Sequence, residues 1–310
     1  MHTECIPITD NNFVKIKKTE NKTMVKFRLS AFSDEYSPSL DEQIEGLITN
    51  KIRMTELRGV DGINVSDLTP LQASDVQKKL EVSGISVSAV GSPIGKINIT
   101  DPMDAHLEKL RNTCEIARIL GTQRIRMFSF YIPDGKHDEY KDEVFERMNK
   151  MLDVADEYDV MLCHENEKGI WGDTPERCAE LMSEFYGRLG CVFDPANFMQ
   201  CGCEPFEHGY DILKKYIDYM HIKDVKKSGV IVPAGVGDCC IPELLSVINL
   251  AHEGDFILTL EPHLKVFEGL AALENGEKSA VGNEYATSAE AFRAAVTHLR
   301  YCIPRNAQIG

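Results

Sequence analysis

Residues 160–167 read VMLCHENE, residues 191–198 read CVFDPANF, and the segment between them opens at Thr174 and Pro175. Each run is apolar at its start and ends in charged or amide side chains. Short apolar runs of this kind are typical of buried strands, whereas the apolar residues between them recur at helical spacing. Threonine followed by proline is typical of the start of a helix. The stretch therefore predicts a strand, a helix and a second, parallel strand.

The same alternation extends outward over most of the chain. Six further runs are FRLSAF from Phe27, RMTELRGV from Arg53, ISVSAVG from Ile85, RIRMFSFY from Arg124, IDYMHIKD from Ile217 and FILTLEPH from Phe256. Eight strands that alternate with helices match the (β/α)8 TIM barrel in number and in total length. The sequence therefore predicts the α/β class and a single barrel domain over residues 24–303.

The two ends of the chain lie outside the predicted barrel. Residues 1–23 are polar and contain lysines, so they predict a short N-terminal extension, and residues 304–310 predict a C-terminal tail. The alternative fold is a doubly wound open sheet, which usually has a glycine-rich turn after its first strand. Here the first strand runs into Ser33, Asp34 and Glu35 without a GxGxxG pattern. The barrel is therefore favoured.

Charge and cysteine content narrow the range of partners. The 310 residues include 49 acidic and 34 basic side chains, and the net charge of −15 would repel a nucleic acid. No apolar run reaches the roughly 18 residues that a membrane helix needs, so no membrane partner is predicted. The ten cysteines are scattered without a CxxC pair. This usage favours a reducing compartment and a cytoplasmic location.

Charged side chains are concentrated at the ends of the last four predicted strands. Four of them are Glu165, Asp194, His221 and Glu261, one from each strand. In a TIM barrel the C-terminal ends of the strands converge on one site. Three carboxylates and one imidazole suit a divalent Mn, Mg, Co or Zn ion. The alternative is that each is an ordinary polar residue where a strand meets solvent, but four unpaired charges among apolar residues would be costly.

The strand ends also resemble those of a known family. The motifs HEN, VFDPAN, HIKD followed by Pro233, Gly235 and Gly237, and LEPH are similar to motifs of the xylose-isomerase-like barrel superfamily. The resemblance extends in particular to its sugar phosphate isomerase/epimerase group, which includes D-tagatose 3-epimerase and hydroxypyruvate isomerase. It implies that the same four residues bind one divalent metal ion, and that Glu165 and Glu261 also act as acid/base residues.

The resemblance and the ligand chemistry together predict an isomerase or epimerase of a small sugar or sugar phosphate. A metal ion on a carbonyl and the neighbouring hydroxyl stabilises an enediolate, so that Glu165 and Glu261 can transfer a proton. The alternatives are a lyase of the inosose dehydratase type on the same site and a non-catalytic sugar-binding barrel. A nuclease of the endonuclease IV type would need more histidine ligands and a basic surface. Members of the family often form dimers or tetramers, so the resemblance also allows a homo-oligomer.

Five more residues are candidates for substrate binding: Lys223, Glu56, Asn197, His263 and Trp171. Lys223 shares a strand face with the histidine of the predicted metal site, and its ammonium group would reach substrate oxygens beside the metal. Asn197 stands where 3-epimerases tend to have a substrate-binding histidine. Trp171, the only tryptophan, would cover the apolar face of a sugar. The alternatives are a solvated Lys223, an ion pair between Glu56 and Arg58, and simple loop packing of Trp171.

A glycine-containing loop does not decide whether the substrate is phosphorylated. The sequence PAGVGD from Pro233 is similar to a loop of the family, and TIM barrels often bind phosphate near the loops after strands seven and eight. The basic residues near this loop are Lys223, Lys226 and Lys227. A free sugar, a phosphorylated sugar and a related polyol or keto acid are all compatible with this pattern.

Overall fold

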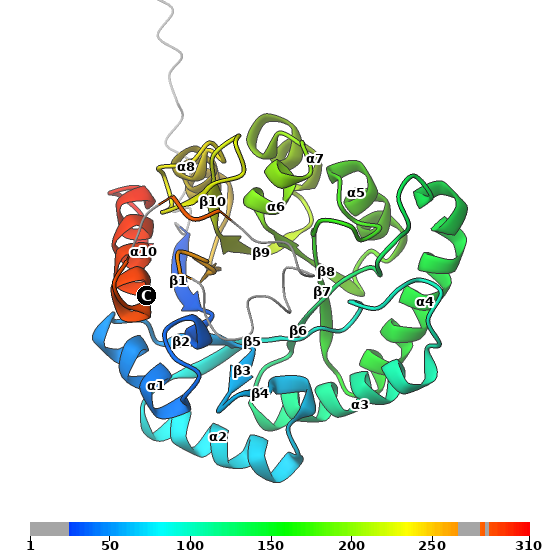
Figure 1. The fold of residues 1–310 in the computed structure, drawn as a ribbon, viewed down its shortest axis with the longest axis horizontal. Coiled ribbons are helices and arrows are strands. Elements are labelled where there is room, and N and C mark those ends of the chain that lie inside the picture. Colours follow the sequence, from blue (N-terminus) through cyan, green and yellow to red (C-terminus); the bar gives the residue numbers. More distant parts are fainter. Residues whose placement is uncertain (1–24, 266–279, 283–284) are drawn as a thin grey trace, which may run out of the picture.

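In the described part of the chain, eight parallel strands curl around the centre of the molecule, with the helices outside them (Figure 1). The computed structural model describes residues 25–265, 280–282 and 285–310. The eight strands are β1 (Lys26–Ala31), β2 (Met54–Leu57), β5 (Ser86–Gly91), β6 (Arg124–Met127), β7 (Met161–Glu165), β8 (Leu189–Phe193), β9 (Ile217–Ile222) and β12 (Asp255–Leu260). Each overlaps one of the eight predicted runs. The α/β class and the TIM barrel are therefore confirmed.

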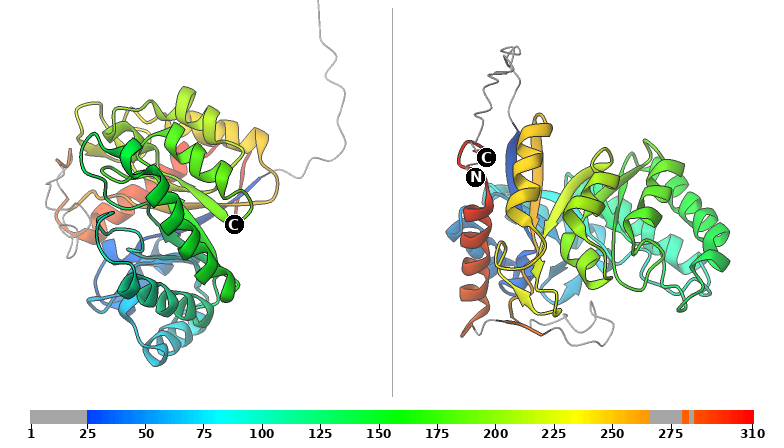
Figure 2. Two further views of the ribbon diagram at one scale, coloured as in Figure 1. Left: turned by 90° about the vertical axis from the view of Figure 1, so that its right-hand side faces the viewer. Right: turned by 90° about the horizontal axis from the view of Figure 1, so that it is seen from above.

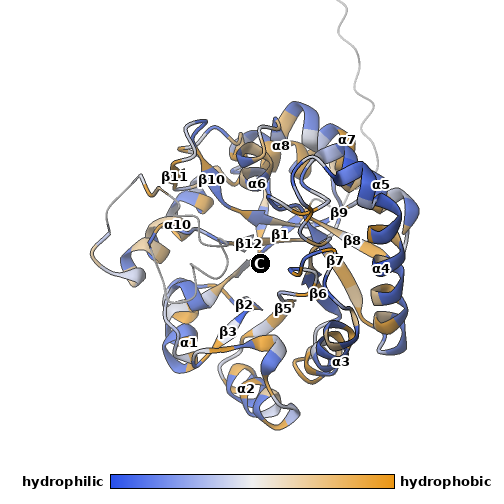
Figure 3. Cartoon of the chain, turned by 45° about the vertical axis from the view of Figure 1, so that its right-hand side comes forward, coloured by the Kyte–Doolittle hydropathy of each residue, from blue (hydrophilic) through white to orange (hydrophobic). Residues whose placement is uncertain are grey.

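Helices cover the outside of the strands. The α-helices of the described residues are α1 (Leu40–Thr49), α2 (Pro70–Val82), α3 (Asp104–Ile119), α4 (His137–Glu157), α5 (Pro175–Glu184), α6 (Pro195–Gln200), α7 (Asp211–Leu213), α8 (Ile241–Ala251) and α10 (Ser288–Cys302). The 3₁₀ helices are η1 (Ser33–Glu35) and η2 (Val65–Asp67), and η3 (Pro205–Tyr210) is a short π-helix. Figure 2 shows α10 beside α8 at one edge of the molecule. The helices carry polar and apolar residues side by side, as amphipathic helices do (Figure 3). Within the described ranges, no helix is both long and apolar enough to span a lipid bilayer.

The helix between β7 and β8 begins where the sequence predicts it. The Thr174 side chain accepts a hydrogen bond from the backbone N–H of Arg177 at 3.3 Å, and Pro175 is the first residue of α5. Threonine satisfies an amide that the helix leaves without a partner, and proline at the first position loses no helical hydrogen bond. The loop from Glu165 to Thr174 therefore ends at a defined point.

Three short strand pairings were not predicted. β3 (Gly59–Val60) and β4 (Ile63–Asn64) form an antiparallel pair, as do β10 (Asp224–Val225) and β11 (Ile231–Val232). β13 (Gln308–Ile309) pairs in parallel with the start of β1. Residues 304–310, predicted as a tail, thus contribute a strand to the sheet. The predicted extension over residues 1–23 lies outside the described residues.

Side chains join the two strands at which the ring closes. The hydrogen-bonded order of the sheet runs from β13 and β1 through β12, β9, β8, β7, β6 and β5 to β2. Between β1 and β2, Thr55 Oγ1 donates to the carbonyl of Ala31 at 3.0 Å, and Ser33 Oγ lies 2.9 Å from Thr55 Oγ1. These contacts hold the ends of β1 and β2 together near the site.

A small apolar layer inside the ring supports the strand ends. It consists of Ala89, Cys163, Val192 and Tyr219, with Ile257 packed against it. Side chains two positions apart point to the same side of a strand. The residues two positions beyond members of this layer therefore point into the C-terminal end of the ring, and they include Glu165, Asp194 and His221.

Candidate metal centre

Four side chains from neighbouring strands meet at the C-terminal end of the ring. Glu165 ends β7, Asp194 follows β8, His221 lies in β9 and Glu261 follows β12. One ligand atom of each lies within 4.8 Å of those of the other three, and all four residues are buried. We name these four residues the quartet. The structure brings together the four residues that the sequence predicts as metal ligands.

Two neighbours hold the first glutamate of the quartet in its charged form. Glu165 Oε1 lies 2.9 Å from His221 Nδ1, and Arg126 Nη1 donates to Glu165 Oε2 at 2.8 Å. Burial alone would raise the pKa of Glu165, but His221 and Arg126 outweigh burial and lower that pKa to about 2. Glu165 is therefore a carboxylate at neutral pH.

Three basic side chains surround the second glutamate. Glu261 Oε1 lies 3.0 Å from Arg58 Nη1 and 3.4 Å from His263 Nε2, and Oε2 lies 3.4 Å from Lys223 Nζ. Burial opposes the charge, but Lys223 and His263 hold the pKa of Glu261 well below its ordinary value. Both glutamates of the quartet are thus available as anionic ligands or as bases.

The two carboxylate oxygens of Asp194 have different roles: one caps a helix and the other faces the site. Oδ1 accepts a hydrogen bond from the backbone N–H of Asn197 at 2.8 Å, which caps α6. Oδ2 is buried, accepts no hydrogen bond from the described residues, and lies 3.1 Å from Lys223 Nζ. Burial outweighs the attraction of Lys223 and raises the pKa of Asp194 to about 6. Oδ2 thus faces the site with an ion-pair contact but no hydrogen bond from the described residues, and together with the oxygen and nitrogen ligand atoms around it, it fits a divalent cation.

Glu56 orients the histidine of the quartet. Glu56 Oε2 lies 3.1 Å from His221 Nε2, and the Tyr219 hydroxyl donates to Glu56 Oε1 at 3.1 Å. Burial lowers the pKa of His221, but Glu165 and Glu56 raise it well above its ordinary value. A carboxylate on the far nitrogen fixes a metal-binding imidazole and increases its basicity. Glu56 therefore contacts His221, and the alternative of an ion pair between Glu56 and Arg58 is not what the structure shows.

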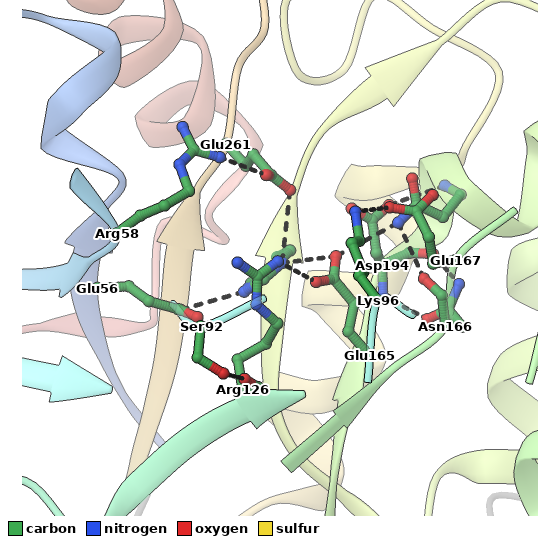
Figure 4. A network of polar contacts seen from close by, with 12 residues as sticks. Glu56, Arg58, Ser92, Lys96, Arg126, Glu165, Asn166, Glu167, Asp194 and Glu261 are labelled. Atoms are coloured by element: carbon green, nitrogen blue, oxygen red, sulfur yellow. Dashed lines mark hydrogen bonds and ion pairs between the residues drawn. The ribbon is translucent and has the colours of Figure 1, made fainter. Parts of the chain in front are cut away.

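Two arginines complete the polar network (Figure 4). Arg58 donates to Asp34 Oδ2 at 2.8 Å as well as contacting Glu261. Arg126, which the sequence analysis did not single out, lies in β6 and reaches Glu165. Its signal in the sequence was a charged residue between apolar ones within a predicted strand. A buried arginine opposite two quartet glutamates supplies positive charge from the first half of the ring.

A cavity of about 760 Å³ adjoins the quartet at Glu261. Three of the predicted substrate-binding residues line it, namely Lys223, Asn197 and His263, and Glu261 lines it as well. Asn197 Nδ2 also donates to Glu165 Oε1 at 3.3 Å. Among the described residues, Glu56 does not line this cavity. The cavity therefore reaches the quartet at Glu261, and it is lined beside the quartet by Lys223 and Asn197, which contact Asp194 and Glu165, respectively.

Among the described residues, Trp171 does not line the cavity. Its side chain is buried, with a residue exposure of 2%, and its Nε1 donates to the carbonyl of His137 at 3.1 Å. Its ring packs edge-on against Phe145, with the two ring centroids 5.3 Å apart. These contacts correspond to loop packing, the alternative considered for Trp171.

The glycine-containing loop folds around a carboxylate of the chain itself. Asp224 Oδ2 accepts backbone hydrogen bonds from Gly235 at 2.8 Å and Gly237 at 2.9 Å, and Oδ1 accepts one from Cys239 at 3.2 Å. A Cβ at position 237 would lie 1.9 Å from Asp224 Oδ1, so the close approach requires glycine there. The amides that would bind a phosphate are thus occupied by Asp224.

The chain belongs to the xylose isomerase-like TIM barrel family, whose model matches residues 52–276. No curated protein matches the chain in sequence. Among solved structures it is similar to the probable 3-DHS dehydratase AsbF of Bacillus anthracis, with 14% identity, a TM-score of 0.67, and coverage of 91% of this chain and 100% of that one. It is also similar to the IOLI protein with a bound zinc atom, with 16% identity, a TM-score of 0.67, and coverage of 89% and 98%.

A third similar structure is an L-ribulose 3-epimerase, with 14% identity, a TM-score of 0.67, and coverage of 89% of this chain and 95% of that one. At these identities the similarity establishes a common barrel fold. The similar structures include epimerases and a dehydratase, so they do not by themselves define the reaction of this chain.

Proposed function

We propose that the protein is a divalent-metal-dependent isomerase or epimerase of a small sugar or sugar phosphate. The observation that carries the proposal is the convergence of the buried quartet beside a cavity of about 760 Å³, which one of its members, Glu261, lines. Membership of the xylose isomerase-like family supports it, as does the similarity to an epimerase and to a protein with bound zinc.

The quartet would hold the ion, which when bound would supply Lewis-acid stabilisation of negative charge on substrate oxygens. Glu261 lines the cavity and is held as a carboxylate, so it is placed to take a proton from a substrate carbon. Glu165 comes from β7, which β8 and β9 separate from β12, and so approaches the substrate from another direction. Delivery of a proton to the opposite face of the same carbon gives epimerisation, and delivery to the adjacent carbon gives isomerisation.

The remaining residues have supporting roles in this proposal. Lys223, Asn197 and His263 line the cavity and would bind substrate oxygens. Glu56 would act as a positioning residue through His221, because it contacts the ring nitrogen that faces away from Glu165.

Metal analysis and hydrogen exchange test the proposal directly. The purified protein is first analysed for bound metal, then loaded separately with Mn²⁺, Mg²⁺, Co²⁺ or Zn²⁺. Each form is incubated in deuterated water with ketoses, their phosphates and inososes. We expect metal-dependent deuterium incorporation at a single carbon, detected by NMR, because proton transfer at one carbon is common to isomerisation and epimerisation.

The products separate this proposal from its rivals. A new sugar with deuterium at one carbon supports an isomerase or epimerase, whereas exchange accompanied by loss of water indicates a lyase. Metal-loaded protein that exchanges no substrate hydrogen with any of these compounds would contradict the proposal and favour a sugar-binding barrel. The Glu261→Gln variant, which should retain the fold but not the exchange, is the control for contaminating activity.

A further inference from the structure

The charge of the cavity is opposite in sign to that of the whole chain. The chain has a net charge of −15. Among the described residues, however, the cavity is lined by six basic side chains, Lys96, Arg126, Lys168, Lys223, Lys226 and Lys227, and by three acidic ones, Asp134, Glu167 and Glu261. A local excess of positive charge in a cavity attracts anions to that site even in an acidic protein.

Two of these cations, one buried and one mostly buried, lie against one aromatic ring. Lys96 Nζ lies 4.3 Å and Arg126 Cζ lies 4.7 Å from the ring centroid of Phe128. The Lys96 side chain is 10% exposed and that of Arg126 is 4% exposed. Lys96 Nζ is 3.1 Å from Glu167 Oε2 and Arg126 Nη1 is 2.8 Å from Glu165 Oε2. Buried, partly desolvated cations bind an oxyanion more strongly than solvated surface lysines do.

The backbone holds Lys96 in this position. The loop after β5 pairs with the loop after β6, because Phe128 N donates to Ile94 O at 2.8 Å and Phe130 N donates to Gly95 O at 3.1 Å. Gly95 has a φ of +88°, and a Cβ there would lie 1.9 Å from Phe128 O. Glycine is therefore required for the close approach that places Lys96 beside Phe128.

The charge balance of these cations depends on the quartet. Glu165 is the ion-pair partner of Arg126, yet it also belongs to the residues that would hold a divalent ion. A carboxylate that coordinates a metal shares its charge with that metal, which leaves Arg126 less neutralised. Arg126 Nε already has no hydrogen-bond acceptor among the described residues. The glycine-containing loop does not offer an alternative anion site, since its amides bind Asp224.

We propose that the substrate carries an oxyanion, a carboxylate or a phosphate, and that Lys96 and Arg126 bind it on the side of the cavity formed by the loops after β5 and β6. This inference rests on the proposed function, because it names the substrate class of the same site. It selects an acidic sugar derivative over a neutral ketose. The Lys96 ammonium and the Arg126 guanidinium are both donors that form charge-assisted hydrogen bonds to such a group.

Three ligands that differ at one carbon test the inference. D-fructose, D-fructose 6-phosphate and D-fructuronate share a ketose skeleton and end in a hydroxyl, a phosphate and a carboxylate, respectively. Their dissociation constants are measured by calorimetry with the Mn²⁺-loaded protein, and inorganic phosphate is used as a competitor. We expect at least one charged ligand to bind ten or more times more tightly than D-fructose, and phosphate to compete with it. The tighter of the two charged ligands identifies the oxyanion.

Variants locate the oxyanion within the cavity. Lys96→Met and Arg126→Gln should each reduce the ratio of the D-fructose dissociation constant to that of the charged ligand at least tenfold, at verified Mn²⁺ content. Lys96→Arg should retain the preference because it retains the charge. Lys79→Met is the matched control, since Lys79 is exposed on α2 and pairs with Asp41. Equal binding of all three ligands, or a preference that survives in both Lys96→Met and Arg126→Gln, would overturn the inference.

Binding and exchange can fail independently. Exchange on neutral ketoses without any preference for charged ligands would keep the proposed function and remove the oxyanion site. A binding preference that depends on Lys96, without hydrogen exchange on any substrate, would keep the oxyanion site and remove the isomerase or epimerase.

Discussion

The two halves of the ring bring different chemistry to the same cavity. The ends of β7, β8, β9 and β12 carry three carboxylates and an imidazole, together with Lys223. The ends of β2, β5 and β6 carry Arg58, Lys96 and Arg126, which pair with acids at the centre or beside it. In the proposed function, the second half would therefore supply the groups that bind a cation and move a proton, whereas the first half would supply positive charge and position those groups.

The largest difference between the halves should appear on removing a base. Glu165→Gln keeps the shape of the side chain but removes its charge and its capacity to accept a proton. We expect metal-dependent hydrogen exchange to fall by a factor of roughly 10³, since general acid/base groups typically contribute 10² to 10⁴. The rate is measured by NMR in deuterated water, and the circular dichroism spectrum should be unchanged. Glu184→Gln, at an exposed position on α5, is the control, and a variant of Glu165 with near-normal exchange would break the division of labour.

A buried acid of the first half should control stability as a function of pH. Burial raises the pKa of Glu35 to about 7, against the opposing attraction of His263 and Arg58. Because the pKa of Glu35 is higher in the folded state, the stabilising contribution of protonated Glu35 is fully present below its unfolded pKa of about 4.5. This contribution is lost as the pH rises through the folded pKa of about 7. In Glu35→Gln, which cannot ionise at this position, the free energy of unfolding should therefore decrease with pH by up to about 3 kcal/mol less than in the wild type.

Urea unfolding of metal-free protein at pH 5 and pH 8 measures this effect. The expected result is a smaller decrease in the free energy of unfolding between the two pH values for Glu35→Gln than for the wild type. Glu81→Gln, exposed on α2, should behave as the wild type does. Identical pH dependence in Glu35→Gln and the wild type would show that Glu35 ionises normally in the folded protein.

Metal affinity should depend both on His221, a residue of the quartet, and on Glu56, which contacts His221 from the first half. His221→Ala removes a ligand, and we expect it to lower metal content strongly. Glu56→Gln leaves the ligand in place but removes the charge that faces His221 Nε2, so the affinity for Mn²⁺ should fall roughly 10- to 100-fold. Competition with a metal chelator measures both. Unchanged affinity in Glu56→Gln would mean that Glu56 has only a packing role.

The smallest effect is expected at Trp171, which belongs to the second half in sequence but not to its site. Trp171→Phe removes the hydrogen bond to His137 and should lower the free energy of unfolding by about 1 kcal/mol. Ligand dissociation constants should not change, because the side chain is buried against Phe145. Weaker ligand binding with unaltered stability would instead place Trp171 in the substrate site.

The second half was easier to predict than the first because its signal is local. Glu165, Asp194, His221 and Glu261 each stand at the end of a mainly apolar run, and strand geometry then places them at one end of the ring. The convergence of these side chains required only the fold class. The positions of the five substrate-binding candidates relative to the cavity were harder to predict, since they depend on where a side chain turns after it leaves the strand. Lys223, Asn197 and His263 reach the cavity, whereas Glu56 and Trp171 do not line it.

The first half was harder because its residues are long and their partners are distant in sequence. Arg126 is one charge within an apolar strand, and its partner Glu165 is 39 positions away. Lys96 lies in a loop whose course depends on hydrogen bonds to the loop after β6. No periodic pattern in the sequence predicts either of these contacts. The strand at Gln308–Ile309 was also missed, because two residues are too few for a pattern.

Apolar periodicity by itself determined the alternation of strands and helices, and therefore which residues stand at the strand ends, because burial of apolar side chains follows the geometry of each element. Only the tertiary structure decided which charges face one another. Ion pairs act over a few ångströms between residues that are far apart in the chain. The contacts of Arg126, Lys96 and Glu56, and the positive charge around the cavity, therefore depend on the closed ring of strands.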